Sequence, residues 1–172
     1  MTRESTFTRG PAAGADDAAW TAPSGPGWAA PPVNRTDGVL ARRLFAYGID
    51  VVVIGALVLV LSVLIGLAGV VTFGLTWGLY AILGPATAIG YGALTVGGPG
   101  AGTVGMRLLG VRAMDARTGD GPSVLAAGAH ALMFYVALGF VALLAVDILL
   151  GLGRQDRRLG HDLLAGLAFV RR

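Results

Sequence analysis

The sequence predicts an all-α polytopic membrane protein, a small helical bundle of about three membrane segments with a disordered N-terminal tail. Charged residues make up only 13% of the 172 residues, against about 25% in soluble domains, and the mean hydropathy is +0.71. No charged residue occurs from Val51 to Met106. Since about 20 apolar helical residues cross the hydrocarbon core of a bilayer, this uncharged run is long enough for two membrane segments.

The N-terminal tail, residues 1–37, differs in composition from the rest of the chain. It is rich in Pro, Gly and Ala and shows no apolar periodicity, so it cannot bury enough surface to offset its conformational entropy. We expect this tail to be disordered, and it lacks the continuous apolar core of a signal peptide. Trp20 and Trp28 would either anchor it near lipid headgroups or dock it on a protein partner. Residues 38–172 then form the transmembrane domain.

Two membrane segments are predicted before residue 100. The first runs from about Leu44 to Leu67, and a short uncharged connection near Gly66 to Gly74 leads to the second, from about Val71 to Val96. Pro85 interrupts the second segment because proline removes one helical hydrogen bond. The stretch VGMRLLGVRAMD beyond it is expected to form a short amphipathic or extended element.

The third apolar region, Val124 to Leu152, admits two interpretations. It either crosses the membrane once, or its first half, to about Tyr135, lies in the interface as a helix while the rest dips in and returns. Two full crossings are not expected, because Gly139 would divide the run into halves too short to span. The segment DLLAGLAFV after it is expected to be an apolar helix lying against the bundle.

The arginines predict the orientation in the cell membrane. Arginine-rich flanks face the cytoplasm, which places the N-terminal tail inside, together with the loop that carries Arg107, Arg112 and Arg117. A single crossing by the third region would leave five C-terminal arginines outside, whereas a re-entrant region would keep them inside. The side of the C-terminal tail therefore stays open.

Asp50 is the leading candidate for a functional residue. A carboxylate inside an apolar segment is costly and is retained with a partner or a function. Arg43 precedes it by seven residues, which places both on nearly the same helix face, while Arg42 can extend to the cytoplasmic surface. Asp50 either binds an ion or proton, or forms a structural ion pair with Arg43 or with an arginine such as Arg107 or Arg158.

Arg42, Arg43 and Asp162 are candidates beside Asp50, and five further residues are weaker candidates: Arg107, His130, Asp147, Arg158 and His161. Asp147 lies near the end of the third apolar region and faces either a cavity or the interface. His130 either titrates near neutral pH or is a satisfied interfacial group. His161 and Asp162 form an adjacent His-Asp pair, as in metal-dependent phosphohydrolases, but the further histidines of those enzymes are missing.

Several classes of site are excluded. The chain has no cysteine and only two histidines, too few for a structural zinc site without carboxylates. It has no lysine, so it cannot contain a P-loop. Gly100, Gly102 and Gly105 fit the G-x-G-x-x-G motif of dinucleotide-binding proteins, but that motif follows a strand of a soluble domain, whereas here it follows a predicted membrane segment. No catalytic set is recognisable, so we expect no enzymatic activity, no cofactor, no metal and no nucleic-acid partner.

Three stretches together resemble the RDD family of bacterial integral membrane proteins. They are ARRLFAYGID, GTVGMRLLGVRAMDARTGD and RRLGHDLLAGLAFVRR, in the family's order around apolar runs, and the resemblance covers about Val39 to Arg171. It implies that the name-giving arginine is Arg42 or Arg43, the first aspartate Asp50 and the second Asp162. The chain departs from the family pattern at Met106, where lysine is common, at His130, where arginine is common, and at Leu167 or Ala168, where threonine is usual.

The resemblance implies transport, the activity proposed for this family, and two hypotheses follow. In the first, the protein transports ions or small solutes and Asp50 is the intramembrane carboxylate. In the second, it is a non-transporting scaffold that binds a protein partner through its tail or its arginine-rich faces, and Asp50 forms a structural ion pair. The lipid bilayer is the expected partner in both, and a chain this small would need to form a homo-oligomer to enclose a pathway.

Overall fold

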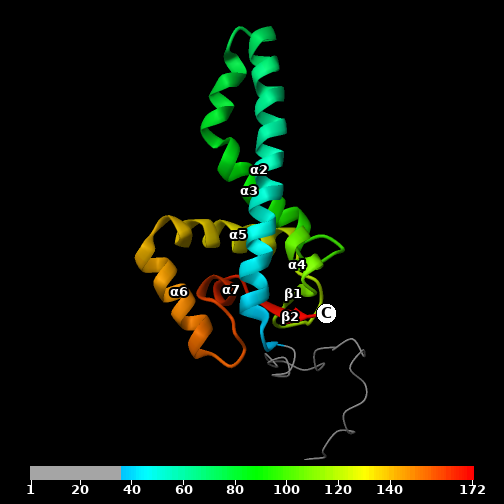
Figure 1. Ribbon diagram of the computed structural model, residues 1–172, viewed down its shortest axis with the longest axis vertical. Helices are drawn as coiled ribbons and strands as arrows, with labels where there is room; N and C mark the ends of the chain where they lie inside the picture. Colours follow the sequence, from blue (N-terminus) through cyan, green and yellow to red (C-terminus); the bar gives the residue numbers. More distant parts are fainter. Residues whose placement is uncertain (1–35) are drawn as a thin grey trace, which may run out of the picture.

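The computed structural model describes residues 36–172, so most of the tail predicted to be disordered, including Trp20 and Trp28, lies outside the described residues. Figure 1 shows the arrangement of the elements. In chain order they are α2 (Val39–Val71), η1 (Leu75–Leu79), α3 (Tyr80–Val96), α4 (Val104–Leu108), β1 (Val111–Asp115), α5 (Val124–Gly139), α6 (Val141–Gly153), α7 (Gly160–Leu164) and β2 (Leu167–Arg171).

Helix α2 and the η1–α3 segment form a hairpin that projects from the rest of the molecule (Figure 1). Val39–Val71 and Leu75–Val96 are the two helical stretches within residues 36–172 that are long and apolar enough to cross a membrane. They correspond to the first two predicted segments. The 33 residues of α2 make it about 50 Å long at 1.5 Å per residue. The chain reverses at Phe73 and Gly74, whose φ angles are 52° and 92°.

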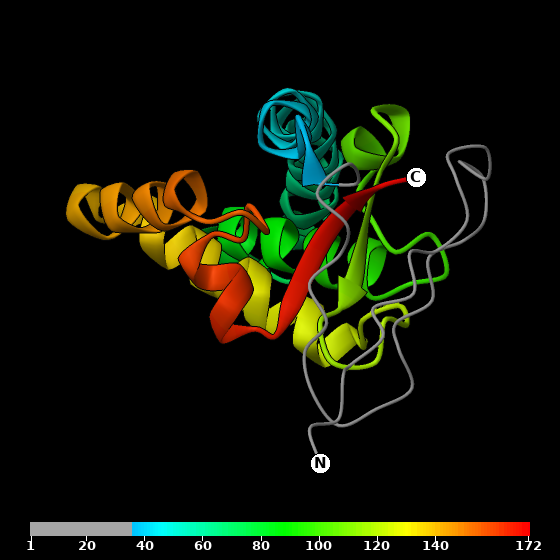
Figure 2. The same cartoon turned by 90° about the horizontal axis from the view of Figure 1, so that it is seen from below.

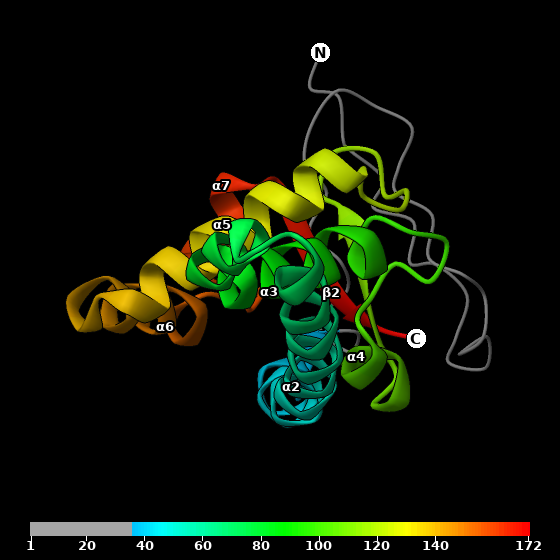
Figure 3. The ribbon, with the colours of Figure 1, turned by 90° about the horizontal axis from the view of Figure 1, so that it is seen from above.

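The third apolar region forms two helices instead of one continuous segment. Helix α5 ends at Gly139 and α6 begins at Val141, because Phe140 between them is extended, with φ −128° and ψ 109°. Both helices are shorter than the stretches that could cross a membrane. Seen from above, they extend together to one side of the α2–α3 hairpin (Figure 3).

Helices α3 and α5 pack closely because small residues face each other. A Cβ atom on Gly92 of α3 would lie 3.0 Å from the Cβ of Ala131 in α5, and one on Gly128 would lie 3.4 Å from the Cβ of Ala93. Such pairs let helix backbones approach. This contact fixes α5 at the base of the hairpin.

A two-stranded sheet corrects the all-α prediction. Strands β1 and β2 are antiparallel, with Val111 opposite Arg171 and Asp115 opposite Leu167. The prediction that DLLAGLAFV forms one helix is also wrong, because α7 ends at Leu164. Gly166, whose φ angle is 69°, ends the turn that follows. Glycine in this left-handed conformation commonly terminates helices.

The buried core lies around this sheet. Leu167 and Phe169 of β2 join a cluster that contains Val39 at the start of α2, whereas Ala168 and Val170 join a second cluster with Met114 and Ala116. Alternate strand residues point to opposite faces, so β2 is buried on both sides. The hairpin, in contrast, leaves most of its leucine and valine side chains exposed.

The pairing of β1 with β2 brings the C-terminal segment back to the start of α2. Figure 2 shows β2 passing beside β1, close to the end of the molecule where α2 begins. Arg42 adds to this assembly, since its Nη1 donates to the carbonyl of Leu109 at the end of α4 over 2.8 Å. The C-terminal strand therefore lies on the same side of the molecule as the first arginines.

We predict that Gly105→Ala destabilises the fold by about 1–3 kcal/mol, the usual range for overpacking. Its Cβ would lie 2.2 Å from the carbonyl oxygen of Ala46, so α4 would have to move away from α2. The matched control is Gly90→Ala, where nothing lies within 4 Å of the new Cβ. Thermal unfolding of the detergent-solubilised protein measures both, and equal midpoints for the two variants would contradict the prediction.

Candidate functional site

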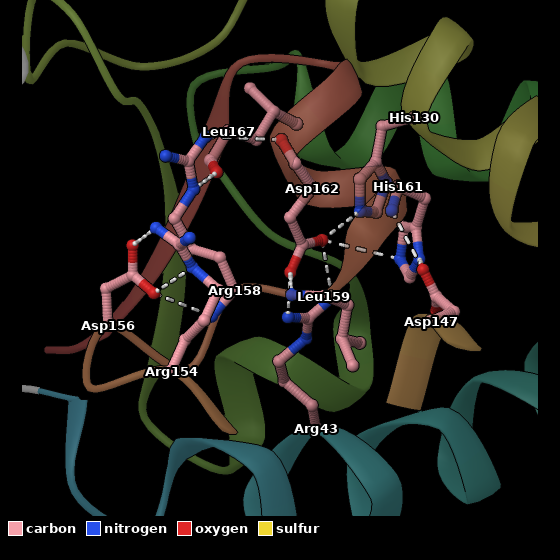
Figure 4. Close-up of polar contacts among 10 residues, drawn as sticks. All are labelled: Arg43, His130, Asp147, Arg154, Asp156, Arg158, Leu159, His161, Asp162 and Leu167. Atoms are coloured by element: carbon pink, nitrogen blue, oxygen red, sulfur yellow. Dashed lines mark hydrogen bonds and ion pairs between the residues drawn. The ribbon is translucent and has the colours of Figure 1, made fainter. Parts of the chain in front are cut away.

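A buried ion pair joins the first and last parts of the described chain. Arg43 on α2 donates through Nη1 to Oδ2 of Asp162 on α7 over 2.5 Å and through Nη2 to Oδ1 over 2.9 Å. Asp162 is fully buried and the Arg43 side chain is 9% exposed. Figure 4 shows the two side chains facing each other from opposite elements. This paired, two-bond geometry is the strong form of an arginine–carboxylate contact.

Asp162 accepts further hydrogen bonds. The backbone N–H of Leu159 donates to Oδ2 over 2.9 Å, and Nε2 of His130 lies 2.8 Å from Oδ1. Burial alone would raise the pKa of Asp162, but Arg43 and His130 together hold it well below its usual range. Asp162 is therefore ionised. Its partner Arg43 makes a second contact, since the guanidinium lies 3.9 Å from the centre of the Phe169 ring, a favourable cation–π distance.

His161 connects Asp162 to a second carboxylate, Asp147. Nδ1 of His161 lies 2.7 Å and 2.9 Å from the two Asp147 oxygens, and its backbone N–H donates to Oδ1 over 2.8 Å. On the other side of the ring, Nε2 lies 3.4 Å from Oδ1 of Asp162. Burial lowers the pKa of His161. The His130 and His161 rings lie 4.7 Å apart between centres, so α2, α5, α6 and α7 meet in one polar network (Figure 4).

Asp50 has neutral donors in place of the predicted arginine. It accepts from the hydroxyl of Tyr91 over 2.7 Å, from the hydroxyl of Thr103 over 2.6 Å and from the backbone N–H of Gly105 over 2.9 Å. Within residues 36–172, no ion pair joins Asp50 to an arginine or histidine. The ion-pair alternative for Asp50 therefore finds no arginine partner within residues 36–172.

The expected arginine partners of Asp50 are engaged elsewhere. Arg43 is paired with Asp162, and Nε of Arg107 donates to the carbonyl of Thr103 over 3.4 Å. Nε of Arg158 donates to the carbonyl of Leu167 over 2.7 Å, which fastens the loop before α7 to β2. Arg43 and Arg158 thus join elements at the base, whereas the contact of Arg107 is local to the start of α4.

The ion-pair network and Asp50 border the same cavity, whose volume is about 490 Å³. This is within the size range of small-molecule sites. Its walls come from α2, α3, α4, α5, α6 and α7 and are mostly apolar. Four of the lining residues are Tyr or Phe. The polar and aromatic lining residues are Arg43, Tyr47, Asp50, Tyr91, Thr103, His130, Phe134, Tyr135, Asp147 and His161. Asp162 lies behind this lining.

The sequence indicated some of these contacts and missed others. Thr103 and Gly105 belong to a stretch that carries the family resemblance, so a signal for them existed, although not for their contact with Asp50. Nothing in the sequence distinguished Tyr91 or Phe169 from other aromatic residues. The pair Arg154–Asp156, whose side chains meet at 2.9 Å, was also missed and lies in the loop between α6 and α7.

We predict that Asp162→Asn destabilises the protein by about 3–5 kcal/mol, the cost of leaving one buried charge unpaired. Arg43 would lose its counter-charge in a site with little access to water. Asp120→Asn, in the exposed loop after β1, is the matched control and should not change stability. The measurement is the free energy of unfolding in mixed micelles, and wild-type stability of Asp162→Asn would contradict the structural importance of the pair.

Comparison with known proteins places the chain in a family. The family model described as "RDD family" matches residues 38–166, a range that contains Arg43, Asp50 and Asp162 and agrees with the resemblance of the three stretches. No curated protein and no solved structure shows a match. Because the matched range is most of the chain, this protein belongs to the RDD family of membrane proteins.

Proposed function

We propose that the α2–α3 hairpin crosses the cell membrane and that its base faces the cytoplasm. The apolar hairpin carries no charge between Val51 and Val96, and the elements that carry arginines, among them α4, β1 and β2, lie at the end opposite its turn (Figure 1). This arrangement fits the positive-inside rule without exception in residues 36–172. Helix α5 then lies across the cytoplasmic end of the hairpin and α6 turns away from the hairpin (Figure 1), so the third apolar region does not cross the membrane in this arrangement.

Within this arrangement, we propose that the protein transports a small cation or cationic solute and that Asp50 is its binding carboxylate. The observation that carries the proposal is the position of Asp50, which faces the cavity with neutral donors and no basic partner within residues 36–172. A carboxylate in such a place attracts positive charge. The aromatic side chains of Tyr47 and Phe134, also in the lining, add faces that attract cations.

A scaffold without transport is the second candidate function. It is favoured by the three hydrogen bonds of Asp50, which come from α3 and from the start of α4 and fasten both to α2. In that case Asp50 has only a structural role. The exposed apolar faces of α5 and α6 would contact lipid or a second copy of the chain, and neither candidate involves enzymatic chemistry.

We predict that wild-type protein in proteoliposomes carries a cation flux and that Asp50→Asn abolishes it. The amide keeps the size of the side chain but removes its charge. Flux is measured with pH- and potential-sensitive dyes for H⁺, Na⁺, K⁺ and choline, and Asp120→Asn should retain wild-type flux. Size-exclusion elution and thermal unfolding establish that each variant is folded.

The two candidates differ in the outcome of this experiment. Loss of flux in a folded Asp50→Asn protein supports transport. Wild-type protein that carries none of these cations, together with marked destabilisation of Asp50→Asn, supports the scaffold. Thr103→Val sharpens the comparison, because it removes one donor to Asp50 and leaves the carboxylate in place; we expect a loss of about 1–3 kcal/mol of stability with flux retained.

A further inference from the structure

We propose that His130, His161 and Asp162 form a binding site for a divalent transition-metal ion of the zinc type at the edge of the cavity. Nε2 of each histidine and one carboxylate oxygen would be the protein ligands. One ligand atom from each of the three residues lies within 4.8 Å of the other two, and all three residues are buried. Two imidazoles and one carboxylate form a ligand set that zinc sites with an open position commonly use.

The orientation of His161 directs Nδ1 to Asp147 and Nε2 to Asp162. An ionised carboxylate only accepts hydrogen bonds, so the contacts of Asp147 with Nδ1 at 2.7 Å and 2.9 Å require the Nδ1–H form of the ring. In the neutral ring Nε2 then carries a lone pair, and it faces Oδ1 of Asp162 at 3.4 Å. The side chain of His161 is only 3% exposed. Nε2 of His161 and Oδ1 of Asp162 thus face each other in a buried place and can share one cation, which would join the contacts that Oδ1 already has with Arg43 and His130.

The spacing suits a tetrahedral ion. Two ligands bound to zinc at 2.0–2.1 Å in tetrahedral geometry lie about 3.3–3.4 Å apart, close to the 3.4 Å between Nε2 of His161 and Oδ1 of Asp162. Nε2 of His130 lies 2.8 Å from the same oxygen, which is hydrogen-bond distance. Metal binding would replace the proton of this bond, as it does at other histidine ligands, and His130 would have to move by about half an ångström.

Asp147 has the position of an orienting residue for such a site. Histidine ligands commonly donate their second ring N–H to a carboxylate, which fixes the ring and increases its basicity. Asp147 makes this contact with His161 through both oxygens. It touches none of the proposed ligand atoms of the other two residues, so it would act through His161 alone.

Arg43 does not block the ion. It contacts Oδ2 of Asp162 at 2.5 Å and Oδ1 at 2.9 Å, so the shorter contact can persist on Oδ2 while Oδ1 binds metal. Apart from the histidines, the formal charges of Arg43, Asp162 and Asp147 sum to −1, and a divalent ion changes this sum to +1. His130 and His161 both line the cavity, which provides the access route and room for a water or solute ligand in the fourth position.

The test uses the full chain without an affinity tag, because the sequence has two histidines and no cysteine and a histidine tag would add ligands. Calorimetry measures Zn²⁺ binding to the purified protein in detergent, and the visible absorption of Co²⁺ reports tetrahedral ligation in the same site. We expect one ion per chain. His130→Gln keeps a donor toward Asp162, and His161→Asn keeps a donor toward Asp147, but each lacks the ligand nitrogen.

We expect Zn²⁺ affinity to fall at least about 100-fold in His130→Gln and His161→Asn, and by about 10–100-fold in Asp147→Asn, the range for residues that orient a ligand. Asp120→Asn should bind like wild type. If the histidine variants fail to fold, the Co²⁺ spectrum of the wild-type protein decides, since a spectrum like that of the hydrated ion overturns the proposal. Zn²⁺ binding that is unchanged in both folded histidine variants overturns it as well.

The outcome is independent of the proposed transport function. Asp50 is not a ligand in this site, so Asp50→Asn should keep wild-type Zn²⁺ affinity even where it abolishes cation flux. Loss of Zn²⁺ binding in folded Asp50→Asn would show that the ion binds at the carboxylate of Asp50 and would contradict the histidine site. Absence of flux together with intact binding at His130 and His161 would contradict the transport function alone.

Discussion

The contact between Arg43 and Asp162 is the interaction on which the base of the molecule depends. It connects α2 to α7, and the same carboxylate holds the N–H of Leu159 and the ring of His130. A buried ion pair adds little stability compared with well-packed apolar residues, but removal of one partner strongly destabilises the fold because the other charge stays buried without a counter-charge. The main effect of the ion pair is therefore to determine which segments pack together, and its contribution to stability is smaller. Helices α5 and α6 and strand β2 pack around it.

Helix α2 organises two different polar arrangements seven residues apart. Arg43 faces the charged network of α7, and Asp50 faces the neutral donors of α3 and α4. Both side chains line the same cavity. A cation near Asp50 would therefore lie in a space that also contains a fixed positive charge and two histidines, which gives the cavity a negative and a positive region along one helix.

The sequence was sufficient for the membrane character and for the residues of the site, but it did not show how those residues pair. The uncharged run after Asp50 identified both long segments, because length and hydropathy determine whether a helix can span a bilayer. Asp50 was identified from its position in an apolar segment and Arg43 from its spacing to Asp50, and the family resemblance added Asp162. Their partners were not identified, because Asp162 lies 119 residues from Arg43 and distant pairing depends on packing. The strand β2 was missed for the same reason. Its apolar residues are compatible with a helix, and only the pairing with β1, which is distant in the sequence, makes this segment a strand.

The separation of Arg43 and Asp162 along the chain also sets an order of events during synthesis. At about 5–20 residues per second, Asp162 emerges on the order of 10 s after Arg43, when α2 and α3 have already been made. During that interval the guanidinium has no carboxylate from α7, so in the proposed membrane arrangement it stays hydrated at the cytoplasmic surface. The hairpin can therefore insert before the cavity exists, and the cavity closes only when the last helix and strand dock onto α2 and β1.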